Sequence, residues 1–207
     1  MEANESTPLR AVALVCTLSP SPAASSSELL ARQTLDALAE HGVTGKSIRI
    51  ADHDVKTGIS TDLGEGDAWP DIRETVLGTD ILILATPIWL GHPSSVCQRV
   101  MERLNAEIGE TDDEGRMLTY GKVAAVCVVG NEDGAHHVSA ELFQGLNDCG
   151  FTLPPNAVTY WVGEAMQGTD YQDLDKTPEK TDATTKTLAA NTAHLARRLK
   201  RNVYPPS

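Results

Sequence analysis

The feature that most constrains this chain is a set of short apolar runs that lack the polar alternation of a half-exposed strand. The clearest is ILILA at Ile81–Ala85, and another is KVAAVCVV at Lys122–Val129. Runs of this kind are typical of parallel strands covered on both faces. Segments with apolar residues at helical spacing lie between them, so we expect strands and helices to alternate along the chain.

This alternation predicts an α/β fold. The expected strands are residues 10–16, 46–51, 80–85, 122–129 and 157–162, and the expected helices are about 26–41, 70–77, 93–108, 135–148 and 179–201. Right-handed crossovers then give a doubly wound five-stranded parallel sheet in the order 2-1-3-4-5, with helices on both faces. In the helix after the third strand, one face is expected to carry Cys97, Val100, Met101, Leu104 and Ile108.

The 207 residues suit a single domain spanning 1–207. We expect residues 1–9 to be a flexible N-terminus and 52–70, rich in Gly, Asp and Thr, to be a loop. Residues 163–178 form a long connection, which is typical of a lid or a subunit contact.

Composition excludes some classes of partner. With 17 Lys and Arg against 29 Asp and Glu, the net charge of −12 argues against nucleic acid or an anionic membrane as a partner. The first residues do not resemble a signal peptide, and no apolar run is long enough to cross a bilayer. The four cysteines are far apart and are expected to fill the core, which favours a reducing cytoplasm.

The loop Thr17–Ser27 follows the first strand and leads into a helix. Free backbone amides and the helix dipole at such a position favour phosphate, although serines that simply start a helix are the alternative. The loop contains no Lys or Arg, so the candidate donors are neutral hydroxyls: Thr17, Ser19, Ser21, Ser25, Ser26 and Ser27.

The loop after the third strand combines a rigid proline, a large aromatic residue and a glycine, which suits a planar ring and favours a flavin. We expect Trp89 to line the dimethylbenzene side of the ring, while backbone amides of residues 88–91 meet its polar edge. The alternative is that Trp89 packs against a neighbouring helix or subunit. The candidate residues are Thr86, Pro87, Ile88, Trp89, Leu90 and Gly91.

The third loop leaves the central apolar strand and enters a helix whose N-terminus is suited to stabilise negative charge on a reduced flavin. Its candidates are Gly130, Asn131, Glu132, Asp133, Gly134 and His137. We expect Glu132 and Asp133 to cap the helix or face solvent, because carboxylates aimed at the ring would oppose that role.

The adjacent histidines of this loop, His136 and His137, invite comparison with a metal site. The nearest carboxylate on the helix is Glu141, and the sequence has no HExxH motif or cysteine partner. No metal site is therefore predicted. His92, before Pro93, is expected to be a surface or capping residue, and we identify no catalytic side chain.

The chain resembles the NAD(P)H-dependent FMN reductase family of flavodoxin-like flavoproteins. The resemblance is strongest in ATPIWLGHPSS (Ala85–Ser95) and VVGNEDGAHH (Val128–His137), and looser in CTLSPSP (Cys16–Pro22). It implies a flavodoxin-like fold, FMN as cofactor, and homodimers or homotetramers in which a neighbouring subunit helps to complete the flavin site. The phosphate loop departs from the family because it lacks the usual basic residue.

The predicted function is therefore an FMN-dependent oxidoreductase that passes a hydride from NAD(P)H through FMN to a quinone, a flavin or another small acceptor. The alternative is a flavodoxin-type electron carrier. Such carriers usually sandwich the ring between aromatics, whereas Trp89 is the only aromatic residue in the three loops. A flavin-free regulatory scaffold is disfavoured, because the acidic clusters do not lie together at the ends of strands one and three.

Overall fold

The structure is a computed structural model that describes residues 8–165 and 167–206. The strands are β1 (Leu9–Val15), β2 (Val43–Arg49), β3 (Ile81–Trp89), β4 (His92–Pro93), β5 (Val123–Gly130) and β6 (Val158–Val162). The helices are α1 (Ser26–Ala39), α2 (Trp69–Leu77), α3 (Ser95–Leu104), α4 (Ala135–Asp148) and α5 (Glu179–Arg201). Short 3-10 turns are η1 (Ile50–Asp52), η2 (Asn105–Gly109) and η3 (Tyr171–Asp173).

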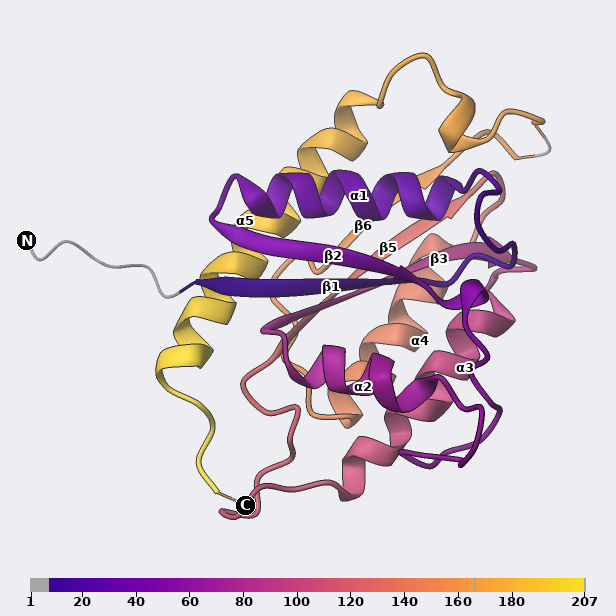
Figure 1. The fold of residues 1–207 in the computed structure, drawn as a ribbon. Coiled ribbons are helices and arrows are strands. Elements are labelled where there is room, and N and C mark those ends of the chain that lie inside the picture. The colour runs from indigo at the N-terminus through magenta and orange to yellow at the C-terminus, as the bar shows by residue number, and fades with distance from the viewer. Residues whose placement is uncertain (1–7, 166, 207) are drawn as a thin grey trace, which may run out of the picture.

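The main sheet is parallel, with the strand order β2-β1-β3-β5-β6, while β4 pairs antiparallel with the end of β3. Apart from β4, this is the predicted order, and the doubly wound fold is confirmed. Helices α1 and α5 cover one face, and α2, α3 and α4 cover the other (Figure 1). The order reverses between β1 and β3, so their carboxyl ends border a crevice of the kind in which such sheets bind ligands.

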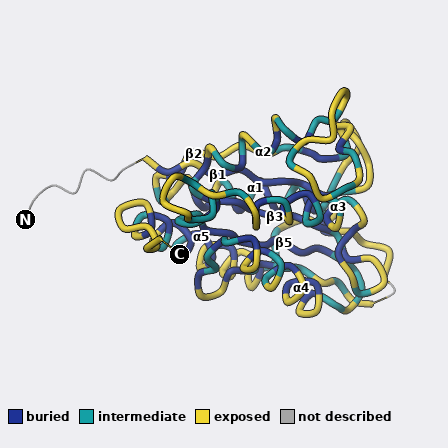
Figure 2. The backbone as a smooth tube through the Cα atoms, turned by 90° about the horizontal axis from the view of Figure 1, so that it is seen from below, coloured by how far each residue is buried: buried dark blue, intermediate teal, exposed yellow. Residues whose placement is uncertain are grey.

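Two apolar clusters, one on each face of the sheet, form the core. Strands β3 and β5 are buried along almost their whole length, as non-alternating runs predict, and Figure 2 shows them inside the helical layers. All four cysteines are buried and free, as expected of core residues.

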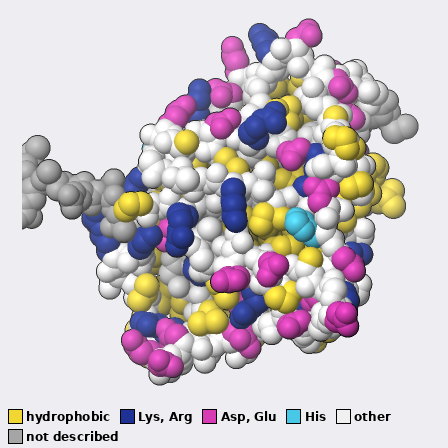
Figure 3. All heavy atoms as spheres, in the orientation of Figure 1, with side chains coloured by type: hydrophobic (Ala, Val, Ile, Leu, Met, Phe, Trp, Pro, Cys, Tyr) yellow, Lys and Arg dark blue, Asp and Glu magenta, His cyan; other side chains and the backbone are white. Residues whose placement is uncertain are grey.

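None of the helices in the described residues has both the length and the apolar character of a membrane span. On the face shown in Figure 3, acidic side chains are spread among basic and apolar ones and are not gathered in one patch.

Several boundaries differ from the prediction. Strand β2 spans Val43–Arg49 and not 46–51, because residues 43–49 pair with β1 and residues 50–52 form the 3-10 turn η1. Leu9, which we assigned to a flexible terminus, is 1% exposed and starts β1; residues 1–7 of that expected terminus lie outside the described residues. Strand β3 continues beyond Ala85 to Trp89, because it pairs with β5 as far as Pro87 and because β4 folds back to pair with its last two residues. Helix α3 ends at Leu104 and is followed by a 3-10 turn, whose tighter winding moves Ile108 off the apolar face, so Ile108 is 48% exposed.

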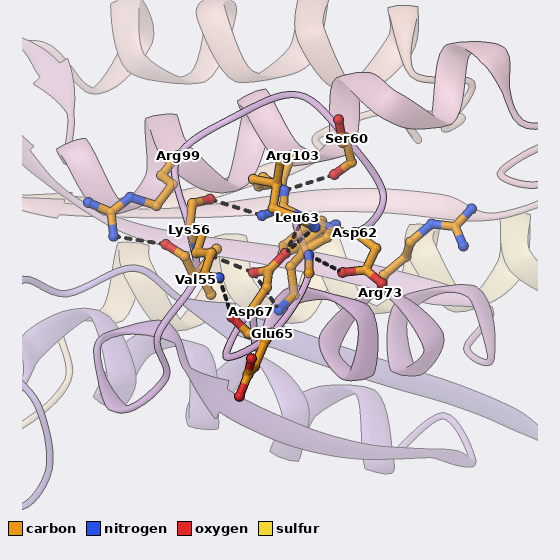
Figure 4. A network of polar contacts seen from close by, with 12 residues as sticks. Val55, Lys56, Ser60, Asp62, Leu63, Glu65, Asp67, Arg73, Arg99 and Arg103 are labelled. Atoms are coloured by element: carbon orange, nitrogen blue, oxygen red, sulfur yellow. Dashed lines mark hydrogen bonds and ion pairs between the residues drawn. The ribbon is translucent and has the colours of Figure 1, made fainter.

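Residues 53–68 contain no helix or strand, as predicted, but they are held firmly by Arg103 of α3 (Figure 4). The guanidinium donates to the carbonyls of Lys56 and Ser60 at 2.9 and 3.0 Å and to Asp67 Oδ2 at 2.7 Å. Neither side chain of the Arg103–Asp67 pair is exposed. Burial alone raises the pKa of Asp67, but hydrogen bonds from Arg103 and from three backbone amides outweigh it and lower that pKa to about 2.

Candidate functional site

A cavity of about 460 Å³ lies at the carboxyl ends of β1, β3 and β5. The loop before α1 forms one wall, the β3–β4 hairpin another, and residues near η3 a third. Its size falls in the usual range for small-molecule sites. The lining residues are Thr17, Leu18, Ser19, Ala24, Ser25, Ser26, Ser27, Pro87, Ile88, Trp89, Leu90, Val129, Gly130, Asn131, Glu132, Trp161, Asp170, Tyr171 and Gln172.

The structure brings residues of all three predicted loops to this one cavity. Twelve of the predicted residues line it: Thr17, Ser19, Ser25, Ser26, Ser27, Pro87, Ile88, Trp89, Leu90, Gly130, Asn131 and Glu132. Six do not, namely Ser21, Thr86, Gly91, Asp133, Gly134 and His137. The parallel topology explains the convergence, because the loops leave neighbouring strands at the same edge of the sheet.

The wall formed by residues 17–27 is built around the N-terminus of α1. Ser25 is the N-cap, and its hydroxyl accepts a hydrogen bond from the Glu28 amide at 3.2 Å. The amides of the first turn and the helix dipole therefore lie beside the cavity, in the arrangement that binds phosphate at helix N-termini.

Arg49 is a basic residue that contacts this loop from outside it and does not line the cavity. It ends β2 beside Val15 of β1, and the buried guanidinium donates to the carbonyl of Ala23 at 2.7 Å and to that of Ser19 at 3.4 Å. It also forms an ion pair with Glu28. The sequence-based prediction missed this residue, although an arginine at the end of the strand next to β1 was a usable signal.

Ser21 faces away from the cavity. Its amide and hydroxyl donate to the two carboxylate oxygens of Asp52, at 2.6 and 2.7 Å. These two hydrogen bonds lower the pKa of Asp52. The Ser21 side chain therefore links the loop to η1. The prediction that Ser21 binds phosphate directly is not supported by its position.

The second predicted loop is an extension of β3 and a tight hairpin. Thr86 is fully buried, and its Oγ1 accepts a hydrogen bond from the Ser94 amide at 3.1 Å, so it supports the hairpin from below. Trp89 is 55% exposed and Leu90 is 90% exposed. Trp89 borders the cavity and does not pack into the core of the chain.

Gly91 and Gly134 allow the hairpin to approach the start of α4. A Cβ on Gly134 would lie 2.9 Å from the Gly91 Cα, closer than real contacts allow, and both glycines have positive φ. These two glycines do not line the cavity, but they allow the β3–β4 hairpin, which forms one of its walls, to pack against α4.

In the third loop, the two acidic residues behave differently. Asp133 is exposed, which fits the expectation that it faces solvent; its Oδ1 accepts a hydrogen bond from the adjacent Gly134 amide at 2.7 Å, but the N-cap of α4 is Gly134, so the helix has no side-chain cap. Glu132 neither caps α4 nor faces solvent: it lines the cavity, and its Oε1 is buried without a hydrogen-bond partner. That part of the prediction was wrong.

The sequence-based prediction also missed an aromatic wall. Trp161 from the end of β6 lies 5.5 Å from Tyr171, measured between ring centroids. Tyr171 is buried and donates to Gln33 at 2.7 Å, while the neighbouring Gln172 amide donates to Ser26 Oγ at 3.2 Å. The residues around η3, in the segment 163–178, therefore form a fixed side of the cavity.

The third wall leaves one more acceptor unused. The buried Oε1 of Gln172 has no hydrogen-bond partner, like that of Glu132. Two unpaired acceptors at one cavity indicate a ligand with several N–H or O–H donors, because a buried acceptor without a partner is costly.

The comparisons with known proteins agree with this geometry. A family model for NADPH-dependent FMN reductase matches residues 9–167, which is more than half of the chain. The chain belongs to the FMN reductase family. Membership supports oxidoreductase chemistry with a flavin cofactor, and the segments that resembled this family include all three loops of the cavity.

Two curated relatives have been given different names. The chain is 36% identical over 199 residues to a divalent metal cation transporter MntH of Mycobacterium bovis, but it spans 29% of that protein's length. It is 32% identical over 206 residues to the 8-demethyl-8-aminoriboflavin-5'-phosphate synthase of Streptomyces davaonensis, covering 95% of the chain and 80% of the relative.

Solved structures give the same fold. RosB with a bound 8-demethyl-8-formylriboflavin-5'-phosphate intermediate has a TM-score of 0.85 at 32% identity, over 95% of this chain and 82% of RosB. An archaeal flavodoxin has a TM-score of 0.59 at 11% identity, over 91% and 99% of the two chains. A flavone reductase has a TM-score of 0.67 at 13% identity, over 95% and 66%; at such identities the likeness concerns the fold alone.

Proposed function

We propose that the cavity binds FMN and that the chain is an NAD(P)H-dependent FMN oxidoreductase. The observation that carries this proposal is the convergence of the α1 N-terminus, the β3–β4 hairpin and the end of β5 on one cavity. The amides and hydroxyls of Ser25, Ser26 and Ser27 would hold the phosphate, with Arg49 fixing the loop behind them. The hairpin and Gly130 would border the ring.

The unpaired acceptors fit this ligand. The ribityl chain carries hydroxyl donors and the pyrimidine edge of the ring carries an N–H, which Gln172 and Glu132 are suited to accept. Once bound, FMN supplies hydride and electron transfer, and the side chains orient it and exclude water from one side. The substrates are a nicotinamide donor and a quinone, flavin or other small acceptor.

The test is a visible spectrum of the untagged protein with added FMN, followed by anaerobic addition of NADPH or NADH. We expect stoichiometric FMN binding and bleaching of the flavin band within the turnover time. Protein that stays free of FMN at micromolar concentration would refute the site, whereas tight binding without reduction would refute only the reductase activity.

A flavodoxin-type electron carrier is the first alternative, and the aromatic residues favour it more than the sequence suggested. Trp89, Trp161 and Tyr171 all border the cavity. Stopped-flow mixing with NADPH separates the two functions, because a carrier is expected to give a stable semiquinone on chemical reduction without accepting hydride from the nicotinamide.

A second alternative is that a flavin phosphate is the substrate of the protein, which modifies the flavin chemically and then releases it. This is favoured by the 32% identity and the TM-score of 0.85 to RosB, whose structure holds a modified riboflavin phosphate. Mass spectrometry of the flavin after aerobic incubation decides: a change in flavin mass supports this alternative, and unchanged FMN with consumed NAD(P)H supports the reductase.

We also propose that the protein forms a homodimer or homotetramer in the cytoplasm. The exposed Trp89 and Leu90 at the hairpin tip give an apolar surface that a second copy would cover beside the cavity. Analytical ultracentrifugation of wild type and a Leu90→Ser variant tests the assembly, with a shift toward monomer expected for the variant.

A further inference from the structure

A cluster of three potential metal ligands lies outside the cavity, where the hairpin meets α4. His137 and Glu141 are four residues apart on α4 and therefore share one helix face. His92 comes from β4, nearly fifty residues earlier in the sequence. The helix alone provides only two potential ligands, and folding adds His92 as the third.

The three side chains converge on one carboxylate oxygen. His92 Nδ1 lies 3.1 Å and His137 Nε2 lies 3.0 Å from Glu141 Oε1. The two imidazole rings meet edge to face, with centroids 4.9 Å apart. One potential ligand atom from each residue lies within 4.8 Å of the other two.

We propose that His92, His137 and Glu141 form a binding site for a divalent transition-metal ion of the Zn²⁺ class. Ligand atoms about 2.0–2.1 Å from a tetrahedral zinc ion are separated from one another by about 3.3 Å, close to the spacing of the two nitrogens from Glu141 Oε1. Two imidazoles and one carboxylate are a common zinc ligand set, which leaves a fourth position for water or another ligand.

The surroundings allow an ion to enter and hold the ligands in place. The side chains of His92, His137 and Glu141 are 59%, 56% and 38% exposed, so no lid has to open. His92 pairs with Trp89 across the β3–β4 ladder, and Gly91 packs closely on Gly134 at the start of α4. A bound ion would therefore fasten the hairpin, including Trp89, to α4.

The test uses the untagged full chain, first treated with a chelator and kept free of FMN. Titration calorimetry measures Zn²⁺ binding, and thermal unfolding is followed with and without Zn²⁺. We expect one equivalent of Zn²⁺ to bind at micromolar concentration and to raise the unfolding temperature. Mg²⁺ should not compete, because it prefers oxygen ligands. Co²⁺ should give the visible absorption of a four-coordinate ion.

His92→Ala and Glu141→Gln should each weaken Zn²⁺ binding by at least about tenfold. The matched control is His136→Ala: this neighbour is also exposed, but its ring contacts Tyr160, 3.2 Å from the hydroxyl, and not the cluster. Circular dichroism verifies the fold of each variant. Zn²⁺ binding that is absent, or equal in wild type and both ligand variants, would overturn the proposal, whatever the outcome of the FMN experiment.

Discussion

Two loop regions of this protein differ in how their buried polar groups are hydrogen-bonded. In residues 53–68, which follow β2, the chain satisfies its own carbonyls and carboxylate with the buried guanidinium of Arg103. The loops after β1, β3 and β5, together with the segment around η3, instead surround a cavity and leave two buried acceptors without partners, Glu132 after β5 and Gln172 in η3.

We infer that residues 53–68 stabilise the fold, whereas the loops around the cavity form a ligand-binding surface. A buried ion pair contributes little net stability, but removing one partner leaves the other charge buried and unpaired, which is costly. Unpaired acceptors at a cavity are also costly, and a ligand with matching donors removes that cost. Substitutions in the first region should therefore act on stability, and those in the second on binding.

The largest effect is expected from Arg103→Met. It leaves the fully buried Asp67 carboxylate without its partner, so the free energy of unfolding should fall by about 3–5 kcal/mol. Urea denaturation followed by circular dichroism measures this. The control is Arg99→Met on the same helix, which removes a single hydrogen bond to the Val55 carbonyl. Figure 4 shows both arginines; if the two variants lose the same stability, the buried Arg103–Asp67 pair has no special role.

The second largest effect is expected from low pH, which should lower the free energy of unfolding through the same region. The pKa of Asp67 is about 2 in the folded protein and about 3.9 in an unfolded chain. A lowered folded-state pKa contributes stability above about pH 4, here about 2–3 kcal/mol, and that contribution is lost as the pH falls toward 2. The free energy of unfolding should be measured across this range.

Asp67→Asn provides the comparison for the acid effect, because it lacks the titrating group. Its stability should depend less steeply on pH than that of wild type between pH 4 and 2. Identical slopes would show that other carboxylates account for the acid response.

The elements that the sequence predicts well are those with strong periodicity. The apolar runs of β3 and β5 and the leucine spacing of α5 specify strands and helices locally, and the parallel order follows from connection rules. The end of α3 was misplaced because Ile108 continues the apolar spacing through a 3-10 turn. Nothing in the local pattern distinguishes the two kinds of winding.

The sequence predicts those site residues whose location follows from their position in the sheet. It does not predict those that are placed by tertiary contacts. Loops after neighbouring parallel strands must converge, so the serines before α1 and the hairpin were predicted to share a cavity. Trp161 and Tyr171 reach it from other elements, Arg49 holds the first loop from outside the cavity, and Ser21 is drawn away by Asp52. Such contacts join residues far apart in the sequence and have no periodic signal.

Behind the cavity wall, Arg49→Gln should have a larger effect on binding than on folding. The loop carbonyls of Ala23 and Ser19 lose their common donor, so the α1 N-terminus is less well ordered for phosphate. We expect FMN affinity to fall about tenfold, equivalent to about 1.4 kcal/mol, by fluorescence titration. Riboflavin, which lacks the phosphate, should bind with unchanged affinity.

A control for net charge is Arg32→Gln, because Arg32 lies on the exposed face of α1. If it weakens FMN binding as much as Arg49→Gln does, the overall field and not the loop contact governs phosphate binding.

The smallest effect on binding is expected from Ser21→Ala, and this variant tests the boundary between the two kinds of loop. Ser21 belongs to the candidate phosphate loop in sequence, but its hydroxyl donates to Asp52 and does not line the cavity. Because both partners are exposed, losing that hydrogen bond should lower the free energy of unfolding only slightly and change FMN affinity by less than about twofold. Ser26→Ala is the matched variant, because Ser26 lines the cavity and accepts a hydrogen bond from the Gln172 amide. A loss of FMN affinity for Ser21→Ala that equals the loss for Ser26→Ala would mean that the loop turns Ser21 toward the phosphate when FMN binds. The cavity walls would then be arranged by the ligand and not by the fold.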